Sequence, residues 1–359
     1  MRILIIKISA FGDVIHALPV LTVIKSIDPD AQLFWAVDAQ FRELLEDNPH
    51  LEGILPLPIR RWKKRFSGGD AGELIDLVRG MRGHRFDVSI DIQGNFKSGI
   101  VSLLSGARLR YGFNREGVRE FPNLLLTNRK VAPRDGDRHV FQKIVRVVEG
   151  AMGGEMKDVS LYPSLFFPRG LREEVREKAG VETGRVNIAI HHGTTWETKK
   201  LSIERWVSVV SALLHEFRDR VPAFYFTWGD GEEREVAQGI IDGAGAGGDT
   251  LLRLAPPLSI KQLAALLSMM DLTIGPDTGP VHLAAAGGAK TLSFYRVTRG
   301  ERNAPLGPSH RYIQAPVDCT GCLKKECDEA KKCELSIPVD AFVEKARELL
   351  DEESPARPT

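Results

Sequence analysis

Two short segments of the sequence carry residues suited to chemistry on a phosphorylated substrate. Asp13 follows the apolar run at the N-terminus, and residues 191–200 read HHGTTWETKK. A carboxylate at position 13 can act as a general base, or it can cap a helix by accepting hydrogen bonds from free amides. The amides after Gly193, the hydroxyls of Thr194 and Thr195, and the ammonium of Lys199 suit a diphosphate. A turn that holds no ligand is the alternative interpretation of this segment.

A third segment, GPDTGPVH at residues 275–282, has the same character. It places Asp277, Thr278 and Gly279 at the start of a helix that begins near Pro280. Helix N-terminal amides and a hydroxyl favour an anion there. The alternative is a capped turn, with His282 as a buried core residue. Two such turns in one half of the chain favour the binding interpretation.

All four cysteines of the chain lie within 15 residues, at Cys319, Cys322, Cys327 and Cys333, in the spacing C-x2-C-x4-C-x5-C. In a cytoplasmic protein two disulfides are disfavoured, and tetrahedral thiolate ligation of zinc or iron is one interpretation. Four reduced thiols in a surface loop are the other. Four ligands leave a metal no open position, so its role would be structural.

The elements that position these segments are read from the hydrophobic pattern. Strands are expected at residues 1–8, 32–38, 53–57 and 88–94. Helices are expected at 14–27, after the second strand up to about residue 45, at 71–83 and after Lys97. Strands that alternate with helices in this way indicate a doubly wound α/β sheet.

The same alternation restarts after a linker at 158–170 that carries two prolines and a glycine. Helices are expected at 171–180, 202–217, 232–242, 259–270, from about 280 to 288, and at 338–351, and strands at 186–193, 222–229, 271–276 and 291–295. We therefore expect one Rossmann-like domain at 1–165 and a second at 166–351, which includes the Cys-rich loop 319–333. The tail 352–359 is expected to be disordered.

The composition is consistent with two packed domains and limits the kinds of binding partner to expect. The chain has 359 residues, 43% of them hydrophobic, and its 49 basic and 48 acidic residues give a net charge of +1. Residues 60–146 hold 19 Lys and Arg against 9 Asp and Glu, which indicates a local polyanion site. No nucleic-acid motif, membrane-spanning run or signal peptide is recognised, so a cytoplasmic protein is expected.

Several of these segments together resemble one family. LIIKISAFGDVIHALPVL, the Gly-Thr-Thr turn with its lysine, WGDGEE at 228–233 and the DTGPVHLAAA run occur in the order found in the lipopolysaccharide heptosyltransferases of glycosyltransferase family 9. IRRWKK at 59–64 and DIQGNFKS at 91–98 resemble heptosyltransferase I in particular. The resemblance implies a GT-B fold, two Rossmann-like domains facing across a cleft.

The resemblance also implies a reaction and roles for residues. The donor would be ADP-heptose and the acceptor Kdo-lipid A at the inner membrane surface, with inversion at the anomeric carbon and no cofactor for catalysis. Asp13 falls on the catalytic base, and Lys199 falls on the group that stabilises the leaving diphosphate. Donor contacts fall on Thr194, Thr195, Lys199, Glu232 (or Glu233), Asp277, Thr278, Gly279 and His282, and acceptor contacts on Arg60, Arg61, Lys63 and Lys64.

Other functions stay open on sequence alone. A GT-B transferase with a different nucleotide sugar or a protein acceptor has the same motifs, and so does a relative that binds a sugar nucleotide without turnover. The retained Asp13 and Lys199 argue against the last of these. The segment YRVTRGERNAP at 295–305 departs from the family pattern, so no donor contact is carried over to it.

Overall fold

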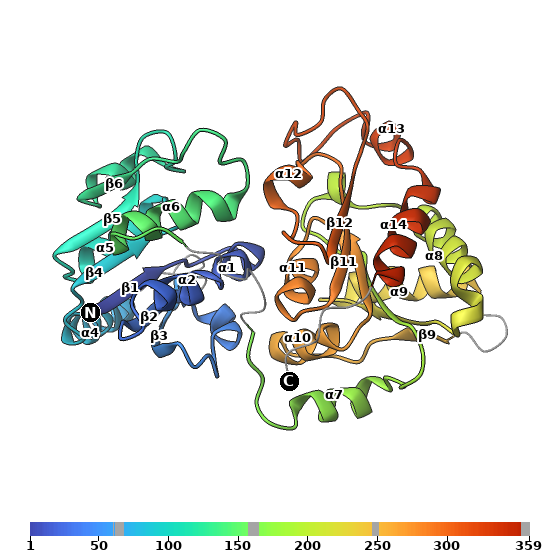
Figure 1. Ribbon diagram of the computed structural model, residues 1–359, viewed down its shortest axis with the longest axis horizontal. Coiled ribbons are helices and arrows are strands. Elements are labelled where there is room, and N and C mark those ends of the chain that lie inside the picture. Colours follow the sequence, from blue (N-terminus) through green and yellow to red (C-terminus); the bar gives the residue numbers. More distant parts are fainter. Residues whose placement is uncertain (60, 62–67, 157–164, 246–250, 353–359) are drawn as a thin grey trace. The chain divides into compact units, whose positions relative to one another are not determined.

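The fold is taken from a computed structural model of the chain, in which residues 1–59, 61, 68–156, 165–245 and 251–352 are described. The chain divides into two compact units, Met1–Phe166 and Phe167–Thr359. Each unit contains one six-stranded sheet with helices packed on it (Figure 1). The two units are described separately below.

The sheet of the first unit has the strand order β3-β2-β1-β4-β5-β6, and every neighbouring pair is parallel. Its central strand β1 is buried from Ile3 to Ile6, as expected for a strand covered by helices on both faces. The strands are β1 (Arg2–Ile6), β2 (Gln32–Asp38), β3 (Leu51–Leu57), β4 (Val88–Asp91), β5 (Leu109–Phe113) and β6 (Arg129–Val131). The helices are α1 (Phe11–Ala17), α2 (Val20–Ile27), α4 (Gly68–Gly83), α5 (Phe96–Leu104) and α6 (Val140–Met152), with 3-10 turns η1 (Ala39–Leu44) and η2 (Phe121–Leu125).

The sheet of the second unit repeats this arrangement with the order β12-β11-β10-β7-β8-β9, again all parallel. Trp206 and the ring cluster of Phe294 and Phe342 fill its core. The strands are β7 (Asn187–His191), β8 (Ala223–Thr227), β9 (Leu251–Leu254), β10 (Leu272–Pro276), β11 (Lys290–Tyr295) and β12 (His310–Gln314). The helices are α7 (Leu171–Ala179), α8 (Ile203–Phe217), α9 (Gly231–Ala244), α10 (Ile260–Ser268), α11 (Gly279–Ala286), α12 (Gly300–Asn303), α13 (Ala330–Leu335) and α14 (Val339–Asp351), with 3-10 turns η3 (Glu197–Lys199) and η4 (Arg218–Arg220).

Each sheet has one point at which the strand order reverses. In the first unit the reversal lies between β1 and β4, and in the second it lies between β7 and β10. Loops that leave the carboxyl ends of such strands diverge to opposite faces, and this opens a crevice in which α/β proteins bind ligands. The Asp13 segment follows β1, and the two candidate anion turns follow β7 and β10.

Most of the predicted elements are present, and the differences have physical reasons. The helix predicted at 14–27 is two helices, because Pro19 has no amide hydrogen to continue the first one. The helical stretch up to residue 45 is the 3-10 turn η1. Helices α6, α12 and α13 and strands β5, β6, β9 and β12 were not predicted from the sequence. The tail and most of the predicted linker lie outside the described residues, among which no helix is long and apolar enough to cross a membrane.

Candidate active site

Asp13 occupies the first turn of α1, at the carboxyl end of β1. One oxygen of its carboxylate, Oδ2, accepts a hydrogen bond from the amide of Ala10 at 3.3 Å. The same oxygen lies 3.5 Å from Nη1 of Arg119, which comes from the loop after β5. The carboxylate therefore does stabilise the helix start, as the capping interpretation requires. It remains partly exposed, so it is also accessible to a substrate hydroxyl.

A pocket of about 450 Å³ lies beside this carboxylate, at the reversal point of the first sheet. Its walls come from the loops after β1, β2 and β4 and from the loop after β5. Gln93 holds the first of these loops, because its side-chain oxygen accepts from the amides of Ile8 at 2.6 Å and Ser9 at 3.2 Å. Polar groups that line the pocket include Ser9, Gln40, Gln93, Asn95, Lys97 and Arg119.

The predicted acceptor cluster is only partly described. Arg60, Lys63 and Lys64 lie outside the described residues. Arg61 is exposed and forms an ion pair with Glu73 of α4. Its charge is therefore partly balanced within the first unit.

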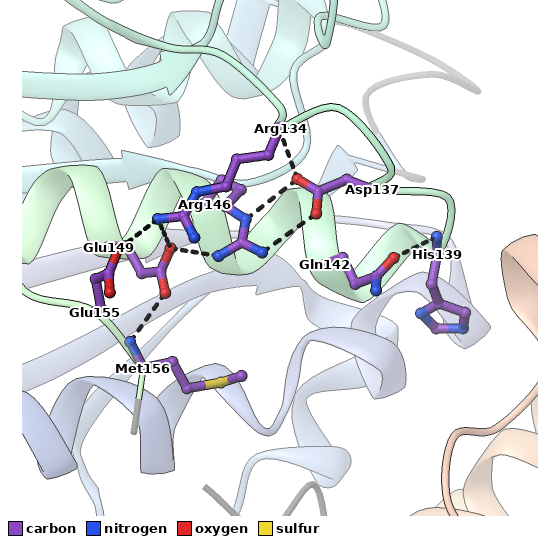
Figure 2. A network of polar contacts seen from close by, with 8 residues as sticks. All are labelled: Arg134, Asp137, His139, Gln142, Arg146, Glu149, Glu155 and Met156. Atoms are coloured by element: carbon purple, nitrogen blue, oxygen red, sulfur yellow. Dashed lines mark hydrogen bonds and ion pairs between the residues drawn. The ribbon is translucent and has the colours of Figure 1, made fainter. Parts of the chain in front are cut away.

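Two arginines of the basic region form internal ion pairs (Figure 2). Arg146 of α6 contacts Asp137 at 3.2 Å and Glu149 at 2.8 Å. Arg134 contacts the same Glu149 at 3.5 Å and Glu155 at 2.9 Å. Burial alone would raise the pKa of Asp137, but hydrogen bonds from Arg146 and from the Arg134 amide lower it below its usual value. These arginines order the loop before α6.

In the second unit the two predicted donor turns meet at one ion pair. Nζ of Lys199, in η3 after β7, lies 2.6 Å from Oδ2 of Asp277, which follows β10. Thr298 donates a hydrogen bond to the same oxygen at 2.9 Å, and Nε2 of His282 lies 3.7 Å from Oδ1. Burial opposes ionisation of Asp277, but His282 and the charge of Lys199 lower its pKa well below the usual value. Asp277 is therefore a buried anion that fixes the lysine between the two turns.

A pocket of about 750 Å³ opens beside these turns at the same edge of the second sheet. Thr194, Thr195 and Thr278 line it, together with the first turn of α9, which carries Glu232 and Glu233. Thr278 is the N-cap residue of α11, but its hydroxyl bonds to no amide of that helix.

The side chain of Glu233 approaches Gly193 closely. A Cβ atom there would lie 2.0 Å from Oε1 of Glu233. The other oxygen of that carboxylate accepts a hydrogen bond from the Gly229 amide at 2.7 Å. Glu233 thus joins the loop after β8 to the turn after β7, whereas Glu232 is exposed at the pocket.

His191 is the last residue of β7 and His192 follows it, and both are buried. Burial lowers the pKa of His191 to about 4, and burial and then the neighbouring His191 lower the pKa of His192 to about 4. Both rings are therefore neutral at pH 7. Nδ1 of His191 lies 3.0 Å from the hydroxyl of Thr227, and neither ring nitrogen of His192 has a partner within the described ranges. Neither histidine was assigned a role from the sequence.

The Cys-rich loop packs against the donor turns. Thr198 of η3 donates to the carbonyl of Lys324 at 2.7 Å, and the Glu334 carboxylate accepts from the amide and hydroxyl of Ser202 at 2.9 and 2.7 Å. The buried Arg296 donates to the carbonyls of Lys200 and Ala330. Arg296 and Thr298 belong to the segment 295–305, so this segment does contribute to the site although no contact was carried over to it.

In the described residues, the four cysteines of the loop 319–333 are not arranged as metal ligands. All four cysteines are free, with Cys319 exposed and Cys333 buried. Burial raises the pKa of the Cys333 thiol, against the opposing effect of Arg296. In the part of the chain that is described, no three His, Cys, Asp or Glu side chains are arranged to hold a metal ion. Zinc or iron at Cys319, Cys322, Cys327 and Cys333 stays a prediction.

Comparison with known proteins identifies the family of the chain. The model of glycosyltransferase family 9 (heptosyltransferase) matches residues 74–333, more than half of the chain. The chain belongs to this family. It is a heptosyltransferase, as the resemblance had indicated, and hence an enzyme.

Individual relatives align with nearly the whole length of this heptosyltransferase. The chain is 30% identical to lipopolysaccharide heptosyltransferase 1 of Pseudomonas aeruginosa, over 91% of this chain and 87% of the relative. It is 26% identical to lipopolysaccharide heptosyltransferase 1 of Campylobacter coli, over 98% of this chain and 100% of the relative. The solved E. coli heptosyltransferase WaaC with ADP aligns with a TM-score of 0.76 at 22% identity, covering 96% of this chain and 99% of that chain. This likeness confirms the predicted fold class of two Rossmann-like GT-B domains.

Proposed function

We propose that this heptosyltransferase transfers heptose from ADP-heptose to Kdo-lipid A, with inversion at the anomeric carbon. The relatives from Campylobacter coli and Pseudomonas aeruginosa are named lipopolysaccharide heptosyltransferase 1, and E. coli WaaC has been solved with ADP and with ADP-2-deoxy-2-fluoro heptose. The observation that carries the proposal is the meeting of two anion-binding turns at the pair of Lys199 and Asp277. The second unit would hold the donor, and the first unit the acceptor.

The donor diphosphate is proposed to lie against the turns after β7 and β10. An ammonium group has three N–H donors, and Asp277 accepts from Lys199 through both its carboxylate and, at 3.4 Å, its carbonyl. A phosphate oxygen can take the third. Thr194, Thr195 and the N-terminus of α11 at Thr278 and Gly279 add hydroxyls and amides. This positive potential stabilises the charge that grows on ADP as the glycosidic bond breaks, without a cofactor.

Glu232 is proposed to bind the ribose hydroxyls of the donor. It lines the pocket of the second unit and is exposed to it. Glu233 lies in the same pocket, but one of its oxygens already bonds to the Gly229 amide. Glu232 is therefore the carboxylate better placed to accept two hydrogen bonds from a diol. His282, in contact with Asp277, is proposed to support the donor loop indirectly.

Asp13 is proposed to act as the general base. It would take the proton of the acceptor hydroxyl while that oxygen attacks the anomeric carbon from the face opposite ADP, which gives inversion. Arg119, with Nη1 3.5 Å from Oδ2, would help to orient the carboxylate. The pocket beside Asp13 supplies amide and cationic groups for a carboxylated sugar, and Arg60, Arg61, Lys63 and Lys64 would meet the lipid A phosphates.

One assay tests the proposal and separates it from the alternatives. The purified chain is incubated with ADP-heptose, a UDP-sugar or a GDP-sugar, with and without detergent-dispersed Kdo-lipid A, and nucleotide release is followed. We expect ADP release only with ADP-heptose and acceptor together, and a product of inverted anomeric configuration. Release with another nucleotide sugar, or no release with any pair, would overturn the proposal.

A further inference from the structure

Two neighbouring elements of the first unit expose large apolar side chains. On α5, Phe96 is 46% exposed and Leu103 is 43% exposed, and on η2, Phe121 is 63% and Leu125 is 87% exposed. Phe96 and Leu103 are seven residues apart, so they lie on one face of the helix. A single exposed apolar residue is ordinary for a globular protein, but four on adjacent elements form a patch that needs a partner.

These two elements are packed firmly against each other. A Cβ atom at Gly99 of α5 would lie 2.7 Å from Cδ1 of Leu126, at the end of η2. The amide of Phe96 donates a hydrogen bond to the carboxylate of Glu120, the N-cap residue of η2, at 2.8 Å. The exposed side chains are therefore held on an ordered platform.

Basic residues surround this platform. Residues 96–130, all within the described ranges, contain seven Lys and Arg but only two carboxylates, Glu116 and Glu120. The guanidinium carbon of Arg115 lies 5.7 Å from the centre of the Phe121 ring. Arg110 donates to the carbonyl of Leu126 at 3.0 Å, and Lys130 donates to the carbonyl of Thr127 at 2.7 Å. Cations thus flank the apolar side chains on both sides of η2.

The platform also borders the pocket beside Asp13. Lys97 and Glu120 line that pocket, and their chain neighbours Phe96 and Phe121 belong to the apolar patch. The apolar patch is therefore continuous along the chain with residues that line the pocket.

We propose that α5 and η2 dock the first unit onto the surface of an anionic bilayer, with Phe121 and Leu125 inserted among the lipid headgroups. Large apolar side chains beside lysines and arginines are the composition that binds a membrane interface, and each basic residue near an anionic surface strengthens binding roughly fivefold. The choice of a bilayer rests on the proposed function, because Kdo-lipid A is a membrane lipid. Docking here would bring its sugar to the pocket while its acyl chains stay in the bilayer.

The first test is sedimentation with vesicles that contain no acceptor. We expect the full chain to bind vesicles rich in phosphatidylglycerol and to bind phosphatidylcholine vesicles weakly. The double variant F121S/L125S should lower the partition coefficient about tenfold or more. The control is I75S/L335S, which removes two large apolar side chains that are also exposed, by 50% and 55%, from other elements. Equal binding of both double variants, or no binding of the wild type, would overturn the proposal.

The second test measures insertion directly. L125W and, as its control, L335W are mixed with anionic vesicles whose lipids carry bromine on the acyl chains. Quenching of tryptophan emission relative to unbrominated vesicles should be larger for L125W than for the control. Equal quenching would show that residue 125 does not insert preferentially into the bilayer, and would overturn the proposal.

Failure of this inference is distinguishable from failure of the proposed function. F121S/L125S should release ADP at the wild-type rate with detergent-dispersed acceptor, because neither residue lines the pocket, and more slowly with acceptor embedded in vesicles. If F121S/L125S has wild-type activity in both formats and binds vesicles normally, the docking surface is refuted but the proposed function is not. If the wild-type protein is inactive with detergent-dispersed acceptor, the proposed function is refuted.

Discussion

Asp13 accepts a hydrogen bond from the Ala10 amide, as many helix-capping residues do, and it also lies 3.5 Å from Arg119 beside a pocket, where it is proposed to act as the base. An asparagine at this position keeps an oxygen for the Ala10 amide but cannot take a proton. We therefore expect Asp13→Asn to lower kcat by about 10²–10⁴-fold with the dissociation constant of ADP nearly unchanged. Initial rates and calorimetric ADP titration measure the two quantities.

Asp13→Ala is the comparison that separates the two roles. It should lose the same activity and in addition about 1 kcal/mol of unfolding free energy, because the amide of Ala10 loses its acceptor. If Asp13→Asn retains near-normal turnover, the carboxylate serves only the helix.

Lys199 is the residue whose charge the donor proposal needs most. We expect Lys199→Ala to weaken ADP binding and to slow transfer, since the diphosphate loses a cation in both the bound state and the transition state. Lys178→Ala is a suitable control because that lysine is exposed on α7 and does not line the pocket beside the two turns. Unchanged ADP affinity and turnover in Lys199→Ala would show that the lysine only neutralises Asp277.

The loop before α6 depends on ion pairs whose members differ in burial. Arg146→Met should lower the unfolding free energy by about 3–5 kcal/mol, because it leaves the largely buried carboxylates of Asp137 and Glu149 without their closest cation. Arg134→Met should cost less than about 1 kcal/mol, because Arg134 is exposed to solvent. Urea unfolding at pH 7 compares them, and equal losses would contradict this division.

The pH dependence of that effect has a definite sign. The pKa of Asp137 is lowered in the folded state, so its stabilising contribution is present above its unfolded pKa of about 3.9 and is lost as the pH falls through the folded value. The difference between wild type and Arg146→Met should therefore be constant from pH 7 to pH 5 and shrink below about pH 4.

The Cys-rich loop carries the metal prediction. If Cys319, Cys322, Cys327 and Cys333 hold zinc or iron, elemental analysis of protein purified without added metal should find about one ion per chain. Chelation should then lower the melting temperature, since the loop is bonded to η3 and to the start of α8. Less than one ion, with four thiols that titrate freely in the native protein, would rule the site out.

The central elements of both sheets could be predicted because their patterns are local. Residues 33–37 form a continuous apolar run within β2, and the turn with Gly275 is followed by a helix as expected. Edge strands such as β6, with Arg129 and Lys130 exposed, carry no apolar run that would reveal them. Their pairing is set by contacts far apart in the sequence.

The site was predictable to a similar extent. Asp277 and Lys199 were recognised separately from turn chemistry and resemblance, but their pairing over 78 positions of sequence could not be read from either turn. Thr298 and Arg296 lie in a segment without a recognisable motif, and only the fold places them against Asp277 and Lys200. Arg119 reaches Asp13 across 106 positions, and no local pattern marks it.

At the scale of the whole molecule, the charge is near zero but unevenly distributed. If the basic region meets an anionic acceptor, replacing Arg60, Arg61, Lys63 and Lys64 by glutamine should raise the KM for the acceptor, while the donor KM changes little. The acceptor KM of the wild type should itself rise with salt, because screening weakens the attraction. Initial rates measured from about 50 to about 300 mM salt test both expectations, because the Debye length changes substantially over this range. An acceptor KM that responds to neither change would mean that these residues are solvated surface charges.

The separate cores of the two units have a consequence for how this protein unfolds. Leu4, Ile6 and Phe34 belong to one buried cluster, and Ile188, Trp206 and Phe294 belong to another. Each cluster can lose its packing as a cooperative block, so denaturation need not be a single two-state transition. A single melting temperature would then mix two equilibria. A change in α6 should move the earlier or the later step of a denaturation curve but not both, and ADP should protect only the block that binds it.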